Sequence, residues 1–237
     1  IPRGSGNEKQ ISDYLYKVAK DLNLEVIQDE HLNILIRKPA TKGYENCPGV
    51  ILQGHMDMVC EKNKDVDHDF EKDPIELRII DDMIYANGTT LGADNGIAVA
   101  MGLAVLASND LSHPALEVLI TSDEEAGMSG AIGLDGNILK GKYIINLDSE
   151  EEGYLLVSCA GGNRSYVTLP LTYKSIDEDK EVLLLEVKGL LGGHSGMDIV
   201  KQRANSNVTM GRVLNLLDVE FDLVEVKKKK KNNAIPR

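Results

Sequence analysis

The sequence has 237 residues, and its 26 Lys and Arg against 38 Asp and Glu give a formal net charge of −12. This acidic balance argues against a nucleic-acid partner, because nucleic-acid binding needs a basic face. The three cysteines have no paired spacing, which argues against a disulfide framework. No apolar run is long enough to cross a membrane. We therefore expect a cytoplasmic protein with reduced thiols.

Hydrophobic periodicity predicts alternating strands and helices in the first part of the chain. Ser5 and Glu8 have the spacing of a capping box ahead of a helix that runs from Ile11 to Leu22. Apolar strands are expected at 24–27, 34–36, 50–52, 83–85, 116–121 and 143–147, and a buried helix poor in charge at 97–107. Together these predict an α/β fold whose mixed, largely parallel sheet has helices on both faces.

The pattern changes near residue 161. Strands at 165–171, 182–188 and 219–226, with a helix near 203–217, predict a smaller α+β domain. The expected domains are therefore 1–160 and 161–237. The lysine run at 227–231 is interpreted as a solvated strand end or hairpin, because the rest of the chain is too acidic for a nucleic-acid patch.

The first candidate site motif follows the strand expected at 50–52. Residues i and i+2 of a strand face the same side, so His55 and Asp57 project together. A metal-bound imidazole usually donates its other N–H to a carboxylate, which suits this pair. Taken alone, the motif is more typical of a surface histidine beside an aspartate.

Three acidic motifs follow at other strand and helix ends. Asp94 lies in a small-residue loop at the entrance to the helix at 97–107, where an ordinary N-cap is the alternative. Glu124 and Glu125 follow the strand at 116–121, and adjacent glutamates point different ways, so one can bind a metal while the other faces a bound water. Asp148 closes the strand that begins at Tyr143.

These motifs point to one site when they are taken together. The carboxyl ends of parallel strands meet at one edge of a sheet, where ligands bind. Imidazole and carboxylate ligands suit Zn²⁺, with Co²⁺ or Mn²⁺ as alternatives, and there are too many ligands for one tetrahedral ion. The sequence therefore predicts two metal ions about 3.5–4 Å apart, with a glutamate that moves the proton of a water during hydrolysis of an amide bond.

Three segments carry a resemblance to a known family: QGHMDMVCEKN at 53–63, ANGTTLGADNGIA at 86–98 and TSDEEAGMSGA at 121–131. They resemble the carboxypeptidase-G2/peptidase-T-like family of di-zinc exopeptidases, and the similarity extends over the whole chain. The resemblance implies metal-dependent hydrolysis of dipeptides, with Xaa-His as the expected class. The alternatives are an N-acyl-amino-acid deacylase, an aminotripeptidase, or a non-catalytic metal-binding or dimerisation fragment.

The resemblance also implies the metal ligands. His55 and Asp148 become ligands of one zinc ion, and Glu125 becomes a ligand of the second. Asp94 becomes the ligand that bridges the two ions, and in this family it often precedes a cis peptide bond.

Three further residues receive catalytic roles from the resemblance. Asp57 becomes the carboxylate that orients the first histidine, and Glu124 the general base that activates the bridging water. The segment 192–196 (GGHSG) resembles the family's lid motif, so His194 is expected to stabilise the oxyanion, in several members within the partner subunit's site. A lid at 161–237 implies a homodimer formed through that domain. The segment 233–236 (NAIP) also resembles a lid segment near the substrate.

One departure from the family concerns the second ion. The family supplies that ion with its own histidine, but none of the remaining histidines, at positions 31, 68 and 113, lies in a matching context. We therefore expect a truncated chain with an incomplete lid and an incomplete metal site.

Overall fold

The computed structural model describes residues 1–149, 153–159, 161, 165–175, 179–194, 198–227 and 234–236. The chain divides into two compact units, Ile1–Gly162 and Asn163–Arg237. In the described residues, no helix is both long and apolar enough to cross a membrane. The three cysteines are free and exposed.

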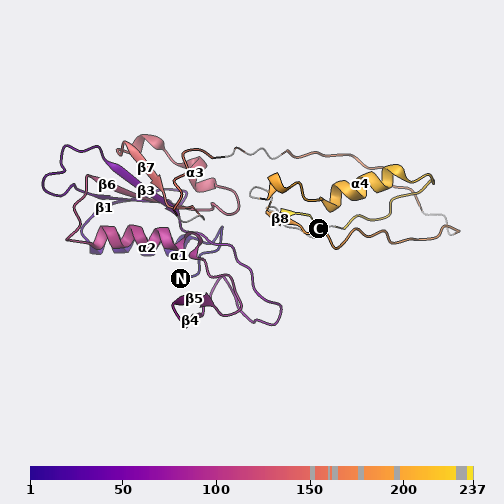
Figure 1. Ribbon diagram of the computed structural model, residues 1–237, viewed down its shortest axis with the longest axis horizontal. Helices are drawn as coiled ribbons and strands as arrows, with labels where there is room; N and C mark the ends of the chain where they lie inside the picture. Colours follow the sequence, from indigo (N-terminus) through magenta and orange to yellow (C-terminus); the bar gives the residue numbers. More distant parts are fainter. Residues whose placement is uncertain are drawn as a thin grey trace. The chain divides into compact units, whose positions relative to one another are not determined.

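A five-stranded sheet organises the first unit, with its strands in the order β1-β2-β6-β3-β7 (Figure 1). The strands are β1 (Glu25–Gln28), β2 (Ile34–Lys38), β3 (Val50–His55), β6 (Leu116–Thr121) and β7 (Tyr143–Asn146). β1, β2 and β6 pair antiparallel, whereas β3 pairs parallel with β6 and with β7. The predicted α/β class and mixed sheet are confirmed, and the parallel pairing is concentrated in the three strands that carry the site motifs.

Helix α1 (Lys9–Asp21) agrees with the predicted helix, but the predicted capping box does not form. Glu8 is itself the residue that precedes the helix, and its carboxylate accepts hydrogen bonds from the amides of Gly6 and Asp123. The Ser5 hydroxyl donates instead to Asp57. Both side chains therefore serve contacts beyond the helix that they precede.

Helix α2 (Ala93–Ala107) is only half buried, which corrects the expectation of a buried helix. Ala98, Gly102 and Leu106 repeat every four residues and face the sheet, while Ile97 and Met101 are exposed. A Cβ atom at Gly102 would lie 2.8 Å from Val118, so the glycine allows the helix to approach β6 closely.

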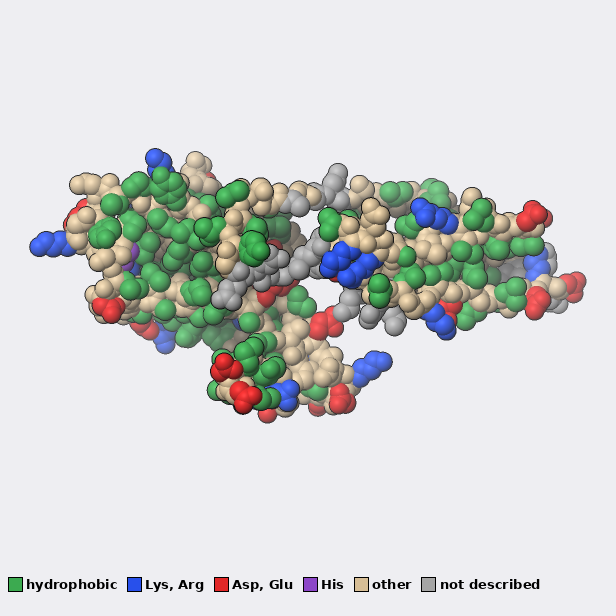
Figure 2. Space-filling model, in the orientation of Figure 1, with side chains coloured by type: hydrophobic (Ala, Val, Ile, Leu, Met, Phe, Trp, Pro, Cys, Tyr) green, Lys and Arg blue, Asp and Glu red, His purple; other side chains and the backbone are tan. Residues whose placement is uncertain are grey.

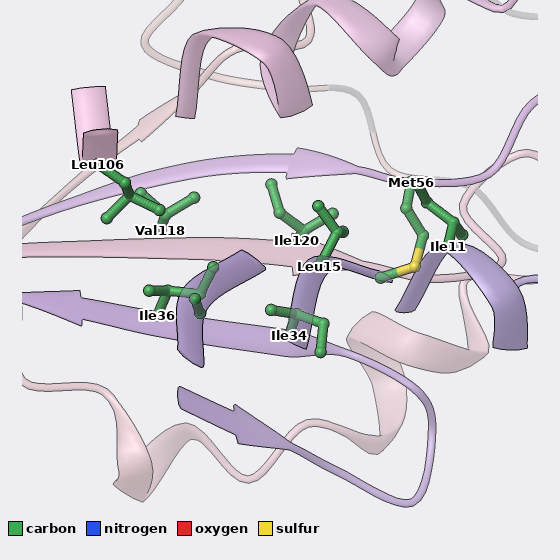
Figure 3. Packing of buried hydrophobic residues seen from close by; sticks show 9 residues of the cluster. Ile11, Leu15, Ile34, Ile36, Met56, Leu106, Val118 and Ile120 are labelled. Carbon is green, nitrogen blue, oxygen red and sulfur yellow. The ribbon is translucent and has the colours of Figure 1, made fainter. Parts of the chain in front are cut away.

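The main core lies between the sheet and the helices α1 and α2 (Figure 3). Its buried members come from both helices, from β2 and β6, and from the residue after β3: Ile11, Leu15, Ala19, Ile34, Ile36, Met56, Leu106, Val118 and Ile120. Because the strand residues come from alternate positions of β2 and β6, the sheet turns one full face toward the two helices.

A smaller apolar cluster covers the opposite face of the sheet. Leu35, Ile51 and Leu119 pack there against residues that follow α3 (Ser129–Gly133), including Ile138 of the short helix η1 (Gly136–Ile138). Both faces of the sheet are thus covered, one by long helices and the other by short helical segments (Figure 1).

A buried ion pair fixes the segment after η1 to the sheet. Glu117 of β6 is 4% exposed and accepts a hydrogen bond from Arg37 of β2 at 2.9 Å. The same carboxylate accepts hydrogen bonds from the amides of Lys140 and Gly141. Arg37 also pairs with the exposed Glu25.

Two parts of the first unit expose apolar side chains (Figure 2). The hairpin of β4 (Leu77–Ile80) and β5 (Met83–Ala86) forms a separate two-stranded sheet with exposed isoleucines. β7, at the end of the strand order, exposes Tyr143, Ile144 and Ile145.

The second unit contains the helix α4 (Ser206–Leu216), as predicted, and a short helix η2 (Ile199–Lys201). Its ladder joins β8 (Gly193–His194) to β9 (Ala234–Ile235) in antiparallel register. The strands predicted at 165–171, 182–188 and 219–226 are absent from the described residues, where those segments find no ladder partner. Except for Lys227, the lysine run lies outside the described residues.

Candidate metal centre

The site motifs meet where the parallel strands end. β3 ends at His55, β6 ends at Thr121 just before the two glutamates, and β7 ends at Asn146 just before Asp148. Asp94 lies in the first turn of α2, and its peptide bond to Asn95 is cis. The sheet topology thus delivers four separate segments to one place.

His55 lies at the centre of the cluster and is almost fully buried. Its Nδ1 lies 3.3 Å from Asp57 Oδ1, and its Nε2 lies 3.2 Å from Asp94 Oδ1. Burial lowers the pKa of His55, but the hydrogen bond with Asp57 and the charges of Asp57, Asp148 and Glu124 outweigh it and raise this pKa to about 9. The imidazole is therefore held with one nitrogen on Asp57 and the other toward the remaining acids.

Asp57 joins this histidine to the loop of the two glutamates. It is fully buried, and its carboxylate accepts hydrogen bonds from the amides of Glu124 at 3.0 Å and Glu125 at 3.1 Å. Burial raises the pKa of Asp57, but the hydrogen bonds from His55, from Ser5 and from these amides lower it to about 2. Asp57 is thus a fixed carboxylate that orients both the imidazole and the glutamate loop.

Two groups of potential ligand atoms share the histidine. His55, Asp94 and Asp148 form one group, and His55, Glu124 and Glu125 the other, with the atoms of each group within 4.8 Å of one another. The first group is the set of residues expected around one ion. The second places Glu125 beside Glu124, and the roles of these residues as ligands and base stay predictions.

Several carboxyl groups in the cluster are electrostatically crowded. Burial raises the pKa of Glu125, and the negative charges of Asp94 and Glu124 add to this shift, which brings the value to about 7. Burial and neighbouring acids likewise raise the pKa of Asp148 to about 6. The pKa of Glu124 is also raised, mainly by burial. A divalent cation would offset this repulsion, so the donor set of one imidazole and several carboxylates fits a metal.

Asn95 supports the centre and was not singled out from the sequence. Its Oδ1 accepts a hydrogen bond from the His55 amide at 3.2 Å, and its Nδ2 donates to the Leu147 carbonyl at 3.0 Å. It therefore connects the ends of β3 and β7 through the start of α2. In the sequence, only its position directly after Asp94 indicated that Asn95 could support the centre.

The other histidines lie outside these groups. Within the described part of the chain, His55 is the one histidine near the acidic cluster. His113 hydrogen-bonds to the carbonyl of Pro114, and the ring of His68 packs edge-on against Phe70. His194 belongs to β8, but its side chain and residues 195–197 lie outside the described part of the structure, as does Asn233 of the second lid segment.

Comparison with known proteins identifies relatives of the chain. The model of "Peptidase family M20/M25/M40" matches residues 51–228. The cytosol non-specific dipeptidase of Escherichia coli is 46% identical over 239 residues, which cover 100% of this chain and 49% of that protein. The chain therefore spans about half the length of this curated relative.

Solved structures give a similar result. Aminoacylhistidine dipeptidase from Vibrio alginolyticus matches with a TM-score of 0.70 and 42% identity, over 100% of this chain and 49% of that one. Aminopeptidase PepT from Bacillus cereus matches with a TM-score of 0.53 and 20% identity over 100% of this chain and 60% of that one, a similarity of fold alone.

Proposed function

Because this chain belongs to peptidase family M20/M25/M40, we propose that it carries most of the metal centre of a cytoplasmic dipeptidase that hydrolyses Xaa-His and related dipeptides. The observation that carries the proposal is the convergence of one buried histidine with four acids at the ends of β3, β6 and β7 and at the start of α2. The substrate class rests on the similarity to the Vibrio alginolyticus and Escherichia coli dipeptidases.

The proposed centre holds two divalent cations, with zinc as the preferred metal. His55, Asp94 and Asp148 would hold one ion, and Asp94 and Glu125 would contribute to the other. When bound, the ions polarise the peptide carbonyl and lower the pKa of a water. Asp57 holds the imidazole in place through the Nδ1 contact of 3.3 Å.

Glu124 is the proposed general base. It lies at the rim of the cluster, 3.8 Å from His55 Nε2, with burial and nearby charge raising its pKa above the usual glutamate value. The carboxylate accepts a proton from the water, whose oxygen attacks the peptide carbonyl carbon. As the C–N bond breaks, Glu124 returns the proton to the leaving amine. His194 is proposed to stabilise the oxyanion, and the second unit to act as a lid and homodimer contact.

The dipeptidase proposal is favoured over its alternatives by the comparisons. The relatives with 42% and 46% identity are both named dipeptidases, whereas the aminopeptidase similarity lies at 20% identity and concerns the fold. A deacylase, an aminotripeptidase or a non-catalytic fragment has no comparable support.

The test separates chemistry from metal binding. In the protein that carries this sequence, Glu124→Gln should lower the kcat for an Xaa-His dipeptide by about 10²–10⁴-fold while the bound metal is retained, because the side chain keeps its size and loses its basicity. Asp94→Asn is the matched variant, and it should lower metal affinity itself. Metal content by elemental analysis and kcat by product detection give the two readouts, and full turnover by Glu124→Gln would refute the base assignment.

A further inference from the structure

The segment from Arg3 to Glu8, called the N-terminal strap below, contacts three of the four segments that carry the candidate metal centre: those after β3, before α2 and after β6. Its backbone pairs with the loop after β3, where the Met58 amide donates to the Arg3 carbonyl at 3.1 Å. Three of its polar side chains, those of Arg3, Ser5 and Glu8, reach different parts of the centre.

Arg3 connects the loop after β3 with the loop that precedes α2. Its Nη1 donates to the carbonyls of Met56 at 2.8 Å and Asp57 at 3.1 Å, and its Nη2 donates to the carbonyl of Gly92. The packing is tight, because a Cβ atom at Gly92 would lie 2.6 Å from Arg3 Nη2. The guanidinium thus fixes the backbone on both sides of the cluster, two residues ahead of Asp94.

Ser5 and Glu8 act on the acidic side of the centre. The Ser5 hydroxyl donates to Asp57 Oδ2 at 2.7 Å, the same oxygen that accepts from the Glu125 amide. Glu8 is 3% exposed, and its Oε1 accepts from the Asp123 amide at 3.0 Å. That amide lies directly before Glu124, so Glu8 fixes the backbone that carries the proposed base.

We propose that the N-terminal strap positions the metal centre, with Arg3, Ser5 and Glu8 as positioning residues that touch neither substrate nor metal. The inference rests on the proposed function, since it concerns the ligand loops of that site. Arg3 sets the loop of Asp94, Ser5 completes the set of donors around Asp57, and Glu8 sets the glutamate loop.

Preorganisation explains why these contacts matter for metal binding beyond their effect on stability. Several carboxylates crowd around His55, with the potential ligand atoms of each group within 4.8 Å of one another, so these like charges repel one another when no cation is bound. Loops without anchors would move these carboxylates apart, and the ion would then have to bring them together at a cost in affinity. Outer partners of metal ligands typically change metal affinity by about 10–100-fold when they are removed.

Ser12 offers a matched control for Ser5. It is buried in α1, its hydroxyl donates to the Leu32 carbonyl at 2.7 Å, and it accepts from Gln28, away from the metal centre. Ser12→Ala therefore removes a buried serine hydroxyl with the same chemistry and without a site contact. If Ser5→Ala lowers metal affinity and Ser12→Ala does not, the effect of Ser5 comes from positioning the centre and not from general stability.

The experiment measures the affinity and the visible absorption spectrum of Co²⁺ bound to the parent chain and its variants. Ser5→Ala and Glu8→Ala should weaken Co²⁺ binding by about 10–100-fold and change the spectrum, as expected for lost outer contacts. Ser5→Thr and Glu8→Gln, which keep the hydroxyl and the carbonyl acceptor, should restore most of the affinity, and Ser12→Ala should bind as the parent does.

A second measurement needs no metal. In the metal-free chain, Glu8→Ala should accelerate hydrogen exchange at the amides of residues 123–125, whereas Ser12→Ala should leave these amides unchanged. If the parent binds no Co²⁺, the proposed function fails and the exchange data alone decide the inference. If Ser5→Ala and Glu8→Ala bind Co²⁺ as tightly as Ser12→Ala does, the strap does not position the centre and the inference is overturned. If no metal binds, the inference is overturned when the amides of residues 123–125 exchange no faster in Glu8→Ala than in Ser12→Ala.

Discussion

At the scale of single residues, Asp57 is the position of the site where a substitution should disturb the most contacts. Its carboxylate is fully buried and accepts hydrogen bonds from Ser5 and from two amides while it contacts the imidazole of His55. Asp57→Asn would place an amide N–H₂ against groups that are themselves donors. We expect it to lower the free energy of unfolding by about 3 kcal/mol, measured by urea denaturation at neutral pH. Asp82→Asn, at an exposed aspartate, is the control and should change little.

Residue-scale chemistry is also where the sequence was most informative. His55 and Asp148 were identified from motifs at strand ends and Asp94 from the loop before a helix, and the structure brings their potential ligand atoms within 4.8 Å of one another. Arg3 and Asn95 were missed because their side chains bind backbone carbonyls and amides that are distant in the sequence. Such contacts leave no pattern in the neighbouring residues. Ser5 and Glu8 had a pattern, but their contacts with Asp57 and Asp123 replaced the expected capping of α1.

At the scale of elements, the pair of Glu117 and Arg37 connects β6, β2 and the segment after η1. Glu117→Ala would leave Arg37 without its buried partner and the amides of Lys140 and Gly141 without an acceptor, so we expect a loss of about 3 kcal/mol in unfolding free energy. Glu25→Ala removes the exposed partner of the same arginine and should cost at most about 1 kcal/mol. Denaturant unfolding curves compare the two. If both variants lost the same unfolding free energy, burial would not determine how much the pair of Glu117 and Arg37 contributes to stability.

Secondary structure was predictable where an element has a nearby partner. β6 was placed at its observed bounds, because its continuous apolar run packs between the covered faces of the sheet. β2 and β7 were placed to within two residues, and each pairs with a neighbouring strand. The strands expected in the second unit have the same apolar character, yet residues such as Val167 and Leu184 are more than nine-tenths exposed. A strand also requires a hydrogen-bonding neighbour, and hydrophobic pattern alone does not specify one.

At the scale of the whole molecule, the crowded acids predict how stability depends on pH. The folded chain raises the pKa of Glu125 from 4.5 to about 7, of Asp148 from 3.8 to about 6 and of His55 from 6.5 to about 9. The metal-free folded state therefore binds more protons than the unfolded state, and its stability should fall as the pH rises through about 4 to 9. Zn²⁺ replaces those protons, so its stabilising effect should grow over the same range.

Thermal melts with Zn²⁺ and with a chelator, measured at intervals across this pH range, provide the check. The gap in Tm between the two series should widen as the pH rises. A gap that stays constant, or metal-free stability that increases with pH, would mean that the cluster does not bear the repulsion inferred from its pKa values.

The exposure of β7 has a practical consequence for a polypeptide that consists of residues 1–237 alone. This strand ends the five-stranded order, and its apolar side chains Tyr143, Ile144 and Ile145 are accessible. A strand in that place is a template to which a second copy can add its own backbone, and an apolar surface favours such aggregation. We expect reversible self-association that strengthens with concentration, and Ile144→Lys should suppress it in sedimentation velocity runs while Co²⁺ affinity is unchanged.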